Sequence, residues 1–294
     1  MKILYYSDTY TQNVMGTKRS IREEVERRGH QCVYHFREEV SDVLRTVQRE
    51  KPDQVWLAHS ALLMHHEDKA KLKIPVIGFG FSDPYYFSSQ RFKSYDAYVT
   101  NHWNTLMKHR AEFPMHYNPT ACDFNFHKDM GLKRENITLI GLAQHPRFGN
   151  ANERIDVTKK LRTLGVPVLT YGAGWGKGAA NHGPIAGEEF LTVINKSVVG
   201  LDIQDDFCPM AHRMFEYAAC GTPVITRRRP EVFKFFKDKE EILTYDTHEE
   251  LYEHLYNNSM DDFANIGAAA RARCFKEHNI THRVDKLLAW AKKL

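Results

Sequence analysis

The sequence predicts an α/β protein with two Rossmann-like domains, and three observations lead to this fold class. Short apolar, strand-like runs alternate with helix-like segments, an order typical of doubly wound parallel sheets. The alternation breaks once, at a turn-rich stretch that begins at Asn118-Pro119, and then restarts. The chain has 294 residues, 42% of them hydrophobic, which is enough for two cores of ordinary size. We therefore expect one domain over residues 1–125 and a second over residues 126–275.

The first series begins with the apolar run Lys2–Ser7 and, after a polar loop, the helix-like stretch Thr17–Arg28. Gly29 follows that stretch and suits a helix C-cap. Further strands are expected at Gln31–Phe36, Gln54–Ala58, Pro75–Phe81 and Tyr95–Thr100, with helices at Ser41–Glu50, Leu62–Leu72 and His102–Phe113.

The second series has the same alternation and ends in helices. Its strands are expected at Ile137–Gly141, Val168–Tyr171, Val198–Ile203, Pro223–Thr226 and Ile242–Thr244. Its helices are expected at Arg154–Leu164, Gly187–Asn195, His212–Cys220 and Pro230–Phe236, and again from Glu249 onward. The last amphipathic stretch, Thr281–Leu294, carries an apolar side, so we expect residues 276–294 to pack back on the first domain.

Composition excludes several protein classes. No apolar run reaches the roughly 18 residues that a membrane span needs, and the N-terminus lacks the pattern of a signal peptide, so a cytoplasmic protein is expected. The five cysteines are scattered without C-x-x-C spacing, which argues against a disulfide framework or a zinc site. The net charge of +4 permits a polyanionic partner without requiring one.

The most informative stretch runs from His212 to Thr226 and predicts a helix that ends at Gly221 and turns into a buried strand. Arg213 and Glu216 are three residues apart and therefore share one face of that helix. Such a pair on its own is most often a surface ion pair of little energetic weight.

The longer phrase Arg213-Met214-Phe215-Glu216-Tyr217-Ala218-Ala219-Cys220-Gly221-Thr222-Pro223 resembles the donor domain of group-1 GT-B glycosyltransferases, and more narrowly their CgeB-like branch. The resemblance covers about residues 118–294 and is weaker over residues 1–117. It includes Ile137–Gly141, then Arg147 or Arg154, Tyr171–Trp175, Asn195–Leu201, and a closing segment from His278 to Arg283.

This resemblance implies a GT-B fold, in which two Rossmann-like domains face a cleft, and transfer of a sugar from a nucleotide donor. Glu216 would accept hydrogen bonds from the ribose hydroxyls, and Arg213, helped by His212, would face the diphosphate. Gly221 and Thr222 would let the backbone approach the donor, and Arg147 would contribute to the same site. The expected donor is a UDP-linked sugar, which is a co-substrate, and no metal or other cofactor is expected.

One departure from the family pattern concerns stereochemistry. Retaining group-1 enzymes usually carry a glutamate eight residues before the ribose-binding one, and here that position is Cys208. The nearest acids, Asp205 and Asp206, are adjacent rather than spaced as Asp-x-Asp, so we do not interpret them as a metal site. Retention or inversion at the anomeric carbon stays open.

The segment Tyr171–Gly178 is rich in glycine and follows a predicted strand. Gly172 and Gly174 could let backbone amides approach a base or phosphate, whereas Trp175 could serve either the donor or the packing. The segment is not a Walker A loop, because Lys177 is followed by glycine. Contact with the donor is the favoured interpretation, and a plain flexible loop is the alternative.

In the first domain, Asp8 and Asp83 each follow a predicted strand and would lie at the cleft. Inverting transfer needs a general base, so both are candidate catalytic residues, with capping or turn roles as the alternative. Gly16 begins the first helix, whose N-terminal amides favour anions. A simple helix cap competes equally with a phosphate role there.

Three alternatives stay open. The acceptor could be hydroxymethylated DNA, a reading compatible with the net charge and with Arg227-Arg228-Arg229. The chain could instead be a non-catalytic nucleotide-binding module, or a nucleotide-sugar epimerase of the same fold. The sugar, the acceptor and the oligomeric state do not follow from the motifs.

Overall fold

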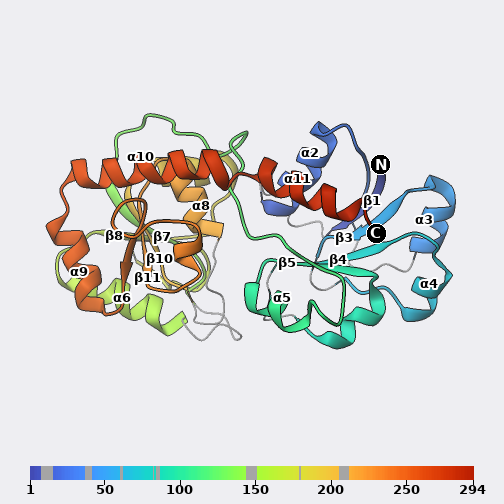
Figure 1. Cartoon of the computed structure of the whole chain (residues 1–294). Helices are drawn as coiled ribbons and strands as arrows, with labels where there is room; N and C mark the ends of the chain where they lie inside the picture. Colours follow the sequence, from blue (N-terminus) through green and yellow to red (C-terminus); the bar gives the residue numbers. More distant parts are fainter. Residues whose placement is uncertain are drawn as a thin grey trace. The chain divides into compact units, whose positions relative to one another are not determined.

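The computed structural model describes residues 1–7, 16–36, 42–59, 62–81, 83, 87–143, 151–178, 180–204 and 212–294 (Figure 1). The chain forms two compact units. The first comprises Met1–Thr120 together with Ile280–Leu294, and the second comprises Ala121–Asn279. Each unit contains a six-stranded sheet whose strands all pair in parallel, which confirms the predicted α/β fold class.

The sheet of the first unit has the order β2-β1-β3-β4-β5-β6. Strands β3, β4 and β5 are buried at every residue, as parallel strands are when helices cover both faces of their sheet. The strands are β1 (Lys2–Ser7), β2 (Gln31–Phe36), β3 (Gln54–Leu57), β4 (Val76–Gly80), β5 (Ala97–Thr100) and β6 (Met115–Tyr117). The helices are α2 (Thr17–Arg27), α3 (Val43–Glu50), α4 (His66–Lys71), α5 (Trp103–His109) and α11 (Ile280–Ala291), with a 3₁₀ helix η1 (Ser89–Ser94).

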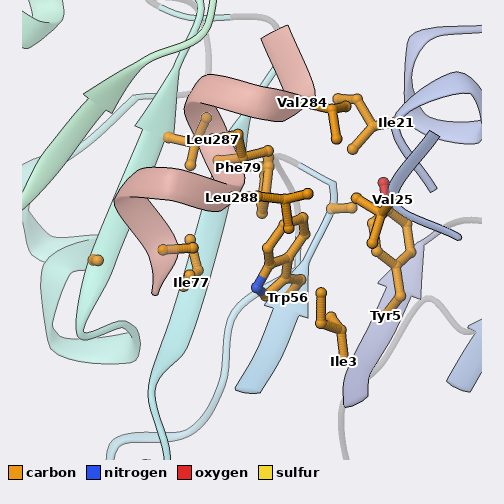
Figure 2. Packing of buried hydrophobic residues seen from close by; sticks show 14 of the residues in the cluster. Ile3, Tyr5, Ile21, Val25, Trp56, Ile77, Phe79, Val284, Leu287 and Leu288 are labelled. Atoms are coloured by element: carbon orange, nitrogen blue, oxygen red, sulfur yellow. The ribbon is translucent and has the colours of Figure 1, made fainter. Parts of the chain in front are cut away.

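Helix α11 belongs to the first unit although it ends the chain. Its residues Val284, Leu287 and Leu288 recur at helical spacing and pack with Trp56 of β3 and Phe79 of β4 in one core (Figure 2). The amide of Gln54 donates to the carbonyl of Ala291 at 2.6 Å, and the Trp56 indole donates to Gln54 at 2.9 Å. Burial of this apolar face therefore attaches the end of the chain to the sheet made by its beginning.

The sheet of the second unit has the order β12-β11-β10-β7-β8-β9. Its strands are β7 (Asn136–Ile140), β8 (Val168–Tyr171), β9 (Asn181–His182), β10 (Ser197–Asp202), β11 (Val224–Arg227) and β12 (Leu243–Tyr245). Its helices are α6 (Ala151–Thr163), α7 (Gly187–Asn195), α8 (His212–Ala219), α9 (His248–Asn257) and α10 (Met260–Glu277), with a 3₁₀ helix η2 (Val232–Lys234). The strand order reverses at β7, which has β8 on one side and β10 on the other.

Two predicted helices differ from the structure, and two observed strands were not predicted. The helix expected at Pro230–Phe236 is reduced to the 3₁₀ helix η2, and the one expected at Leu62–Leu72 is the shorter helix α4. Edge strands β6 and β9 were not predicted, because two or three residues are too few to show an apolar alternation. Among the described residues, no helix combines the length and the apolar composition that a membrane span requires.

Candidate active site

The carboxyl edge of the second sheet is where the candidate site lies. The strand order reverses between β7 and β10, and open α/β sheets bind ligands beyond the carboxyl ends of their strands at such a point. Helices α6 and α8 follow these two strands in the chain, so both begin at this edge. Side chains in the first turn of either helix are therefore placed at the switch point.

Arg213 and Glu216 lie in the first turns of α8 and form an ion pair, Arg213 Nη1 with Glu216 Oε2. The Arg213 Nε also donates to the carbonyl of Ile140, the last residue of β7, at 3.4 Å. Its guanidinium lies 4.6 Å from the ring centroid of Phe190. The Arg213 side chain is 31% exposed and that of Glu216 only 12%, so the pair offers a cation to a ligand and keeps its carboxylate largely buried.

Glu216 is held in its ionised form. Burial by itself would raise the pKa of this carboxyl, but the charge of Arg213 and the hydrogen bond that it donates, together with the nearby histidines His127 and His212, outweigh that effect and lower the pKa. A buried carboxylate with a lowered pKa accepts hydrogen bonds at neutral pH. The structure thus brings together Arg213, Glu216 and His212 of the predicted donor site.

The glycine-rich segment after β8 lies against the loop after β7. Gly172 has a φ of 128° and leaves no space for a Cβ, which would clash with the carbonyl of Gly141. The indole of Trp175 donates to that same carbonyl at 2.8 Å and packs on the core of the second unit. Gly174 also has a positive φ, of 87°. The three predicted residues Gly172, Gly174 and Trp175 therefore lie beside the strand end that anchors Arg213, with Trp175 also serving the packing.

Gly221 and Thr222 lie at the other end of α8, about 12 Å along a helix of eight residues. Gly221 has a φ of 71° and terminates the helix. The Thr222 hydroxyl donates to the carbonyl of Ile194 at 2.9 Å and also contacts Arg134. Gly221 therefore terminates the helix, and Thr222 serves the packing around it. Neither residue lies beside Arg213 and Glu216 at the start of α8.

Two further residues lie at the carboxyl edge: Asp202, which was not predicted as a site residue, and Arg154, which the family resemblance gave as the alternative to Arg147. Asp202 ends β10, is 2% exposed and accepts a hydrogen bond from Gln204 at 2.6 Å, and burial raises its pKa. Arg154 donates to the carbonyls of Ile203 at 2.8 Å and Leu142 at 2.7 Å, so it joins the loops after β10 and β7. An acidic residue one position before the end of the predicted strand Val198–Ile203 was the signal that could have identified Asp202.

His127 was also not predicted as a site residue. It lies in the turn-rich stretch that begins at Asn118-Pro119, where the sequence shows no periodic pattern. Its side chain is buried, and its Nε2 lies 3.9 Å from Oε1 of Glu216.

Asp83 of the first unit is only 1% exposed. It accepts hydrogen bonds from the hydroxyls of Thr100 at 2.6 Å and Tyr98 at 3.1 Å, both in β5. Burial raises its pKa to about 6, near the range that suits a general base. In this conformation its oxygens serve contacts within the first unit, so an acceptor contact would require the side chain to become exposed.

Asp83→Asn is expected to remove a pH dependence of stability. Because burial raises the Asp83 pKa from 3.8 to about 6, the folded chain binds this proton more tightly than the unfolded chain. The stability from this group is therefore fully present below about pH 4 and lost as pH rises through about 6. As the pH rises from about 4 to about 6, the free energy of unfolding of the variant should increase by on the order of 3 kcal/mol relative to that of the wild type. Urea unfolding at each pH measures this difference. A difference that stays constant with pH would contradict the prediction.

The remaining predicted site residues are Gly16, Asp8 and Arg147. Gly16 precedes α2, and its carbonyl accepts the backbone N–H of Ser20 at 3.0 Å, which is the geometry of a helix cap. Asp8 and Arg147 lie outside the described residues. So do Asp205, Asp206 and Cys208, the positions that bear on metal binding and stereochemistry. In the described ranges no three His, Cys, Asp or Glu side chains gather as metal ligands would.

The run Arg227-Arg228-Arg229 does not form an open basic surface. Arg228 pairs with Asp246 at 2.7 Å and with Asp238 at 3.0 Å. Arg227 lies 3.5 Å from Glu153, and Arg229 is buried and donates to the carbonyl of Gln204. These contacts remove this run as an argument for a nucleic-acid partner.

Residues 154–289 match the glycosyl transferase-like family, and this range includes β8, β10, α8 and the Arg213–Glu216 pair. This part of the chain is therefore glycosyl transferase-like in sequence. The match names the family as a whole, and the CgeB-like branch stays a prediction. No protein of curated function matches the sequence.

Solved structures of low sequence identity share the fold of this chain, which is the GT-B fold. Sucrose-phosphate synthase from Thermosynechococcus elongatus has 10% identity and a TM-score of 0.70, with 100% of this chain and 98% of that chain covered. Anabaena HepE in complex with UDP-glucose has 12% identity and a TM-score of 0.72, with both chains fully covered. An α-glucosyltransferase in complex with UDP and a 13-mer DNA containing an HMU base has 12% identity and a TM-score of 0.73, with 99% of each chain covered.

Proposed function

We propose that this chain is a glycosyltransferase, which moves a sugar from a UDP-linked donor to an acceptor hydroxyl without a metal ion. The observation that carries the proposal is the ion pair of Arg213 and Glu216 in the first turns of α8, at the point where the strand order reverses. At such an edge, a cation suits the diphosphate of a nucleoside diphosphate, and an ionised carboxylate suits its ribose hydroxyls.

The chemistry assigns each side chain a separate task. As the bond between the sugar and the diphosphate breaks, negative charge develops on the leaving phosphate, and the guanidinium of Arg213 would stabilise it. The carboxylate of Glu216 would accept hydrogen bonds from the ribose hydroxyls. Two of the structures that share the fold contain UDP or UDP-glucose, which supports uridine diphosphate as the first ligand to test.

A ligand panel with and without EDTA tests the donor site. UDP should raise the melting temperature of the protein by mass action, more than other nucleoside diphosphates, and EDTA should leave the shift unchanged. The shift should disappear in Glu216→Ala and persist in Glu253→Ala, a matched substitution of an exposed acid on α9. No shift with any nucleotide at millimolar concentration would overturn the proposal, and a shift that EDTA abolishes would overturn its metal-independent part.

Hydroxymethylated DNA is the second candidate acceptor. The observation that favours it is the likeness in fold, over 99% of both chains, to the α-glucosyltransferase that was solved with UDP and DNA. Incubation with a UDP-sugar and an oligonucleotide that contains hydroxymethylated bases should then add one sugar mass per modified base. If the sugar nucleotide is hydrolysed or epimerised and no acceptor gains mass, the epimerase alternative is favoured instead.

A further inference from the structure

His127 occupies a tight turn at the start of the second unit. The carbonyl of Asp123 accepts the backbone N–H groups of His127 at 2.6 Å and Phe126 at 3.0 Å. The Asp123 carboxylate caps the same turn through the N–H of Asn125 at 2.9 Å. His127 is only 6% exposed, and the turn fixes the position of its ring. The Nε2 atom of this ring lies near Glu216 of α8.

The contacts of Nδ1 determine which ring nitrogen of His127 carries the proton. The backbone N–H of Asp123 donates to Nδ1 at 3.0 Å, and the Asp123 carbonyl lies 3.1 Å from the same atom. That carbonyl already accepts two backbone N–H groups, whereas the N–H of Asp123 is directed at Nδ1. Nδ1 is therefore the acceptor, and a neutral imidazole then carries its hydrogen on Nε2.

The Nε2 atom is buried and has no hydrogen-bond partner among the residues that the structure describes. It lies 3.9 Å from Oε1 of Glu216, while Arg213 holds the other carboxylate oxygen, Oε2. Leaving a buried donor unsatisfied is unfavourable, and a movement of about 1 Å would bring Nε2 and Oε1 to hydrogen-bond distance. The two oxygens of Glu216 are thus approached by a different donor from each side.

We propose that His127 is a positioning residue for the donor site: its Nε2–H donates to Oε1 of Glu216 when a nucleotide binds, and so orients the carboxylate toward the ribose hydroxyls. Arg213 holds Oε2 and His127 holds Oε1, which fixes the plane of the carboxylate. This inference rests on the proposed function, because it assigns the ribose contact to Glu216. His127 acts through Glu216 and does not itself contact the reacting atoms.

Two substitutions separate the Nε2 donor from the turn. In His127→Asn the Asn amide oxygen can still accept the N–H of Asp123, but no group reaches Glu216. UDP affinity, measured by calorimetry, should fall about tenfold, while the affinity for pyrophosphate, which has no ribose, should stay the same. His127→Gln places an amide N–H near the original Nε2 and should remain within about threefold of the wild type. His254→Asn, a matched change on α9, should leave both affinities unchanged.

A double-mutant cycle distinguishes positioning from general damage. If His127 acts through Glu216, adding His127→Asn to Glu216→Gln should cause no further loss of UDP affinity. Additive losses, an equal loss of UDP and pyrophosphate affinity, or an unchanged UDP affinity in His127→Asn would each overturn the inference.

A measurement without ligand keeps this inference separate from the proposed function. In ¹⁵N-histidine NMR spectra, the signal that His127→Asn removes should show the Nε2–H tautomer and should shift in Glu216→Gln. A Nδ1–H tautomer would overturn the inference. Failure of the wild type to bind UDP would overturn the proposed function together with the ribose role, and the tautomer would then decide only the pairing of His127 with Glu216.

Discussion

Arg213→Met should reduce sugar transfer roughly 10²- to 10³-fold, the usual cost of removing one donor that stabilises charge in a transition state. The methionine keeps an apolar contact with Phe190 but removes the only guanidinium that pairs with Glu216 among the described contacts. The measurement is the initial rate of UDP release from the donor sugar that the ligand panel identifies. An unchanged rate would contradict the assignment of the diphosphate to Arg213.

The same substitution should also destabilise the fold, because it leaves the Glu216 carboxylate buried without its main counter-charge. Breaking a fully buried pair costs about 3–5 kcal/mol, and partial exposure of Arg213 reduces the expected loss to on the order of 2 kcal/mol. The double variant Arg213→Met/Glu216→Gln neutralises the carboxylate and should recover most of the stability while transfer stays lost. This control separates the loss of catalysis from the loss of stability.

The substitution Gly267→Val should strongly lower the free energy of unfolding of the second unit. Gly267 of α10 is buried against the turn that ends α8, and a Cβ there would clash with the carbonyl of Gly221 and lie 3.0 Å from Cδ of Pro223. Gly221 cannot easily move, because its φ of 71° terminates α8. Overpacking of this kind costs roughly 1–3 kcal/mol, and the branched valine should place the loss at or above the upper end of that range.

The decisive measurement is urea unfolding of Gly267→Ala, which shows whether this substitution raises or lowers the free energy of unfolding. In an open helix position glycine to alanine stabilises by about 1 kcal/mol, whereas here a net loss is expected. Ala268→Met adds bulk at an exposed neighbour on the same helix and should change the free energy of unfolding by no more than about 0.5 kcal/mol. A stabilised Gly267→Ala variant would show that α8 and α10 can separate without cost.

The fold class follows from the local hydrophobic pattern of the sequence, because parallel strands that are buried on both faces are short apolar runs between amphipathic helices. Both six-stranded parallel sheets are of the kind that the two α/β series predicted. The prediction of a helix at Pro230–Phe236 was wrong. The chain there makes only a 3₁₀ turn before the buried residues Phe235 and Phe236. Packing of these aromatic residues around His278 overrides the local helical signal.

The candidate site was predictable where its residues are close in sequence. Arg213 and Glu216 share a helical turn, so their spacing alone places them on one face, and the motif around them indicates their chemistry. Asp83 was predicted at a strand end, but its almost complete burial depends on Tyr98 and Thr100 of a different strand. Gly221 and Thr222 belong to the same motif as Glu216, yet they lie at the opposite end of the helix.

The sequence by itself determined the two α/β series, the Arg213–Glu216 pair and the amphipathic face of the last helix, because each depends on residues a few positions apart. Only the tertiary structure decided that His127 faces Glu216, 89 positions later, at 3.9 Å, and that Gly172 presses against Gly141. It also decided that Arg227 and Arg228 pair with acids from other segments and that Arg229 is buried against the carbonyl of Gln204. Such contacts join residues that are distant along the chain, and their geometry is set by how helices and strands pack rather than by any local periodicity.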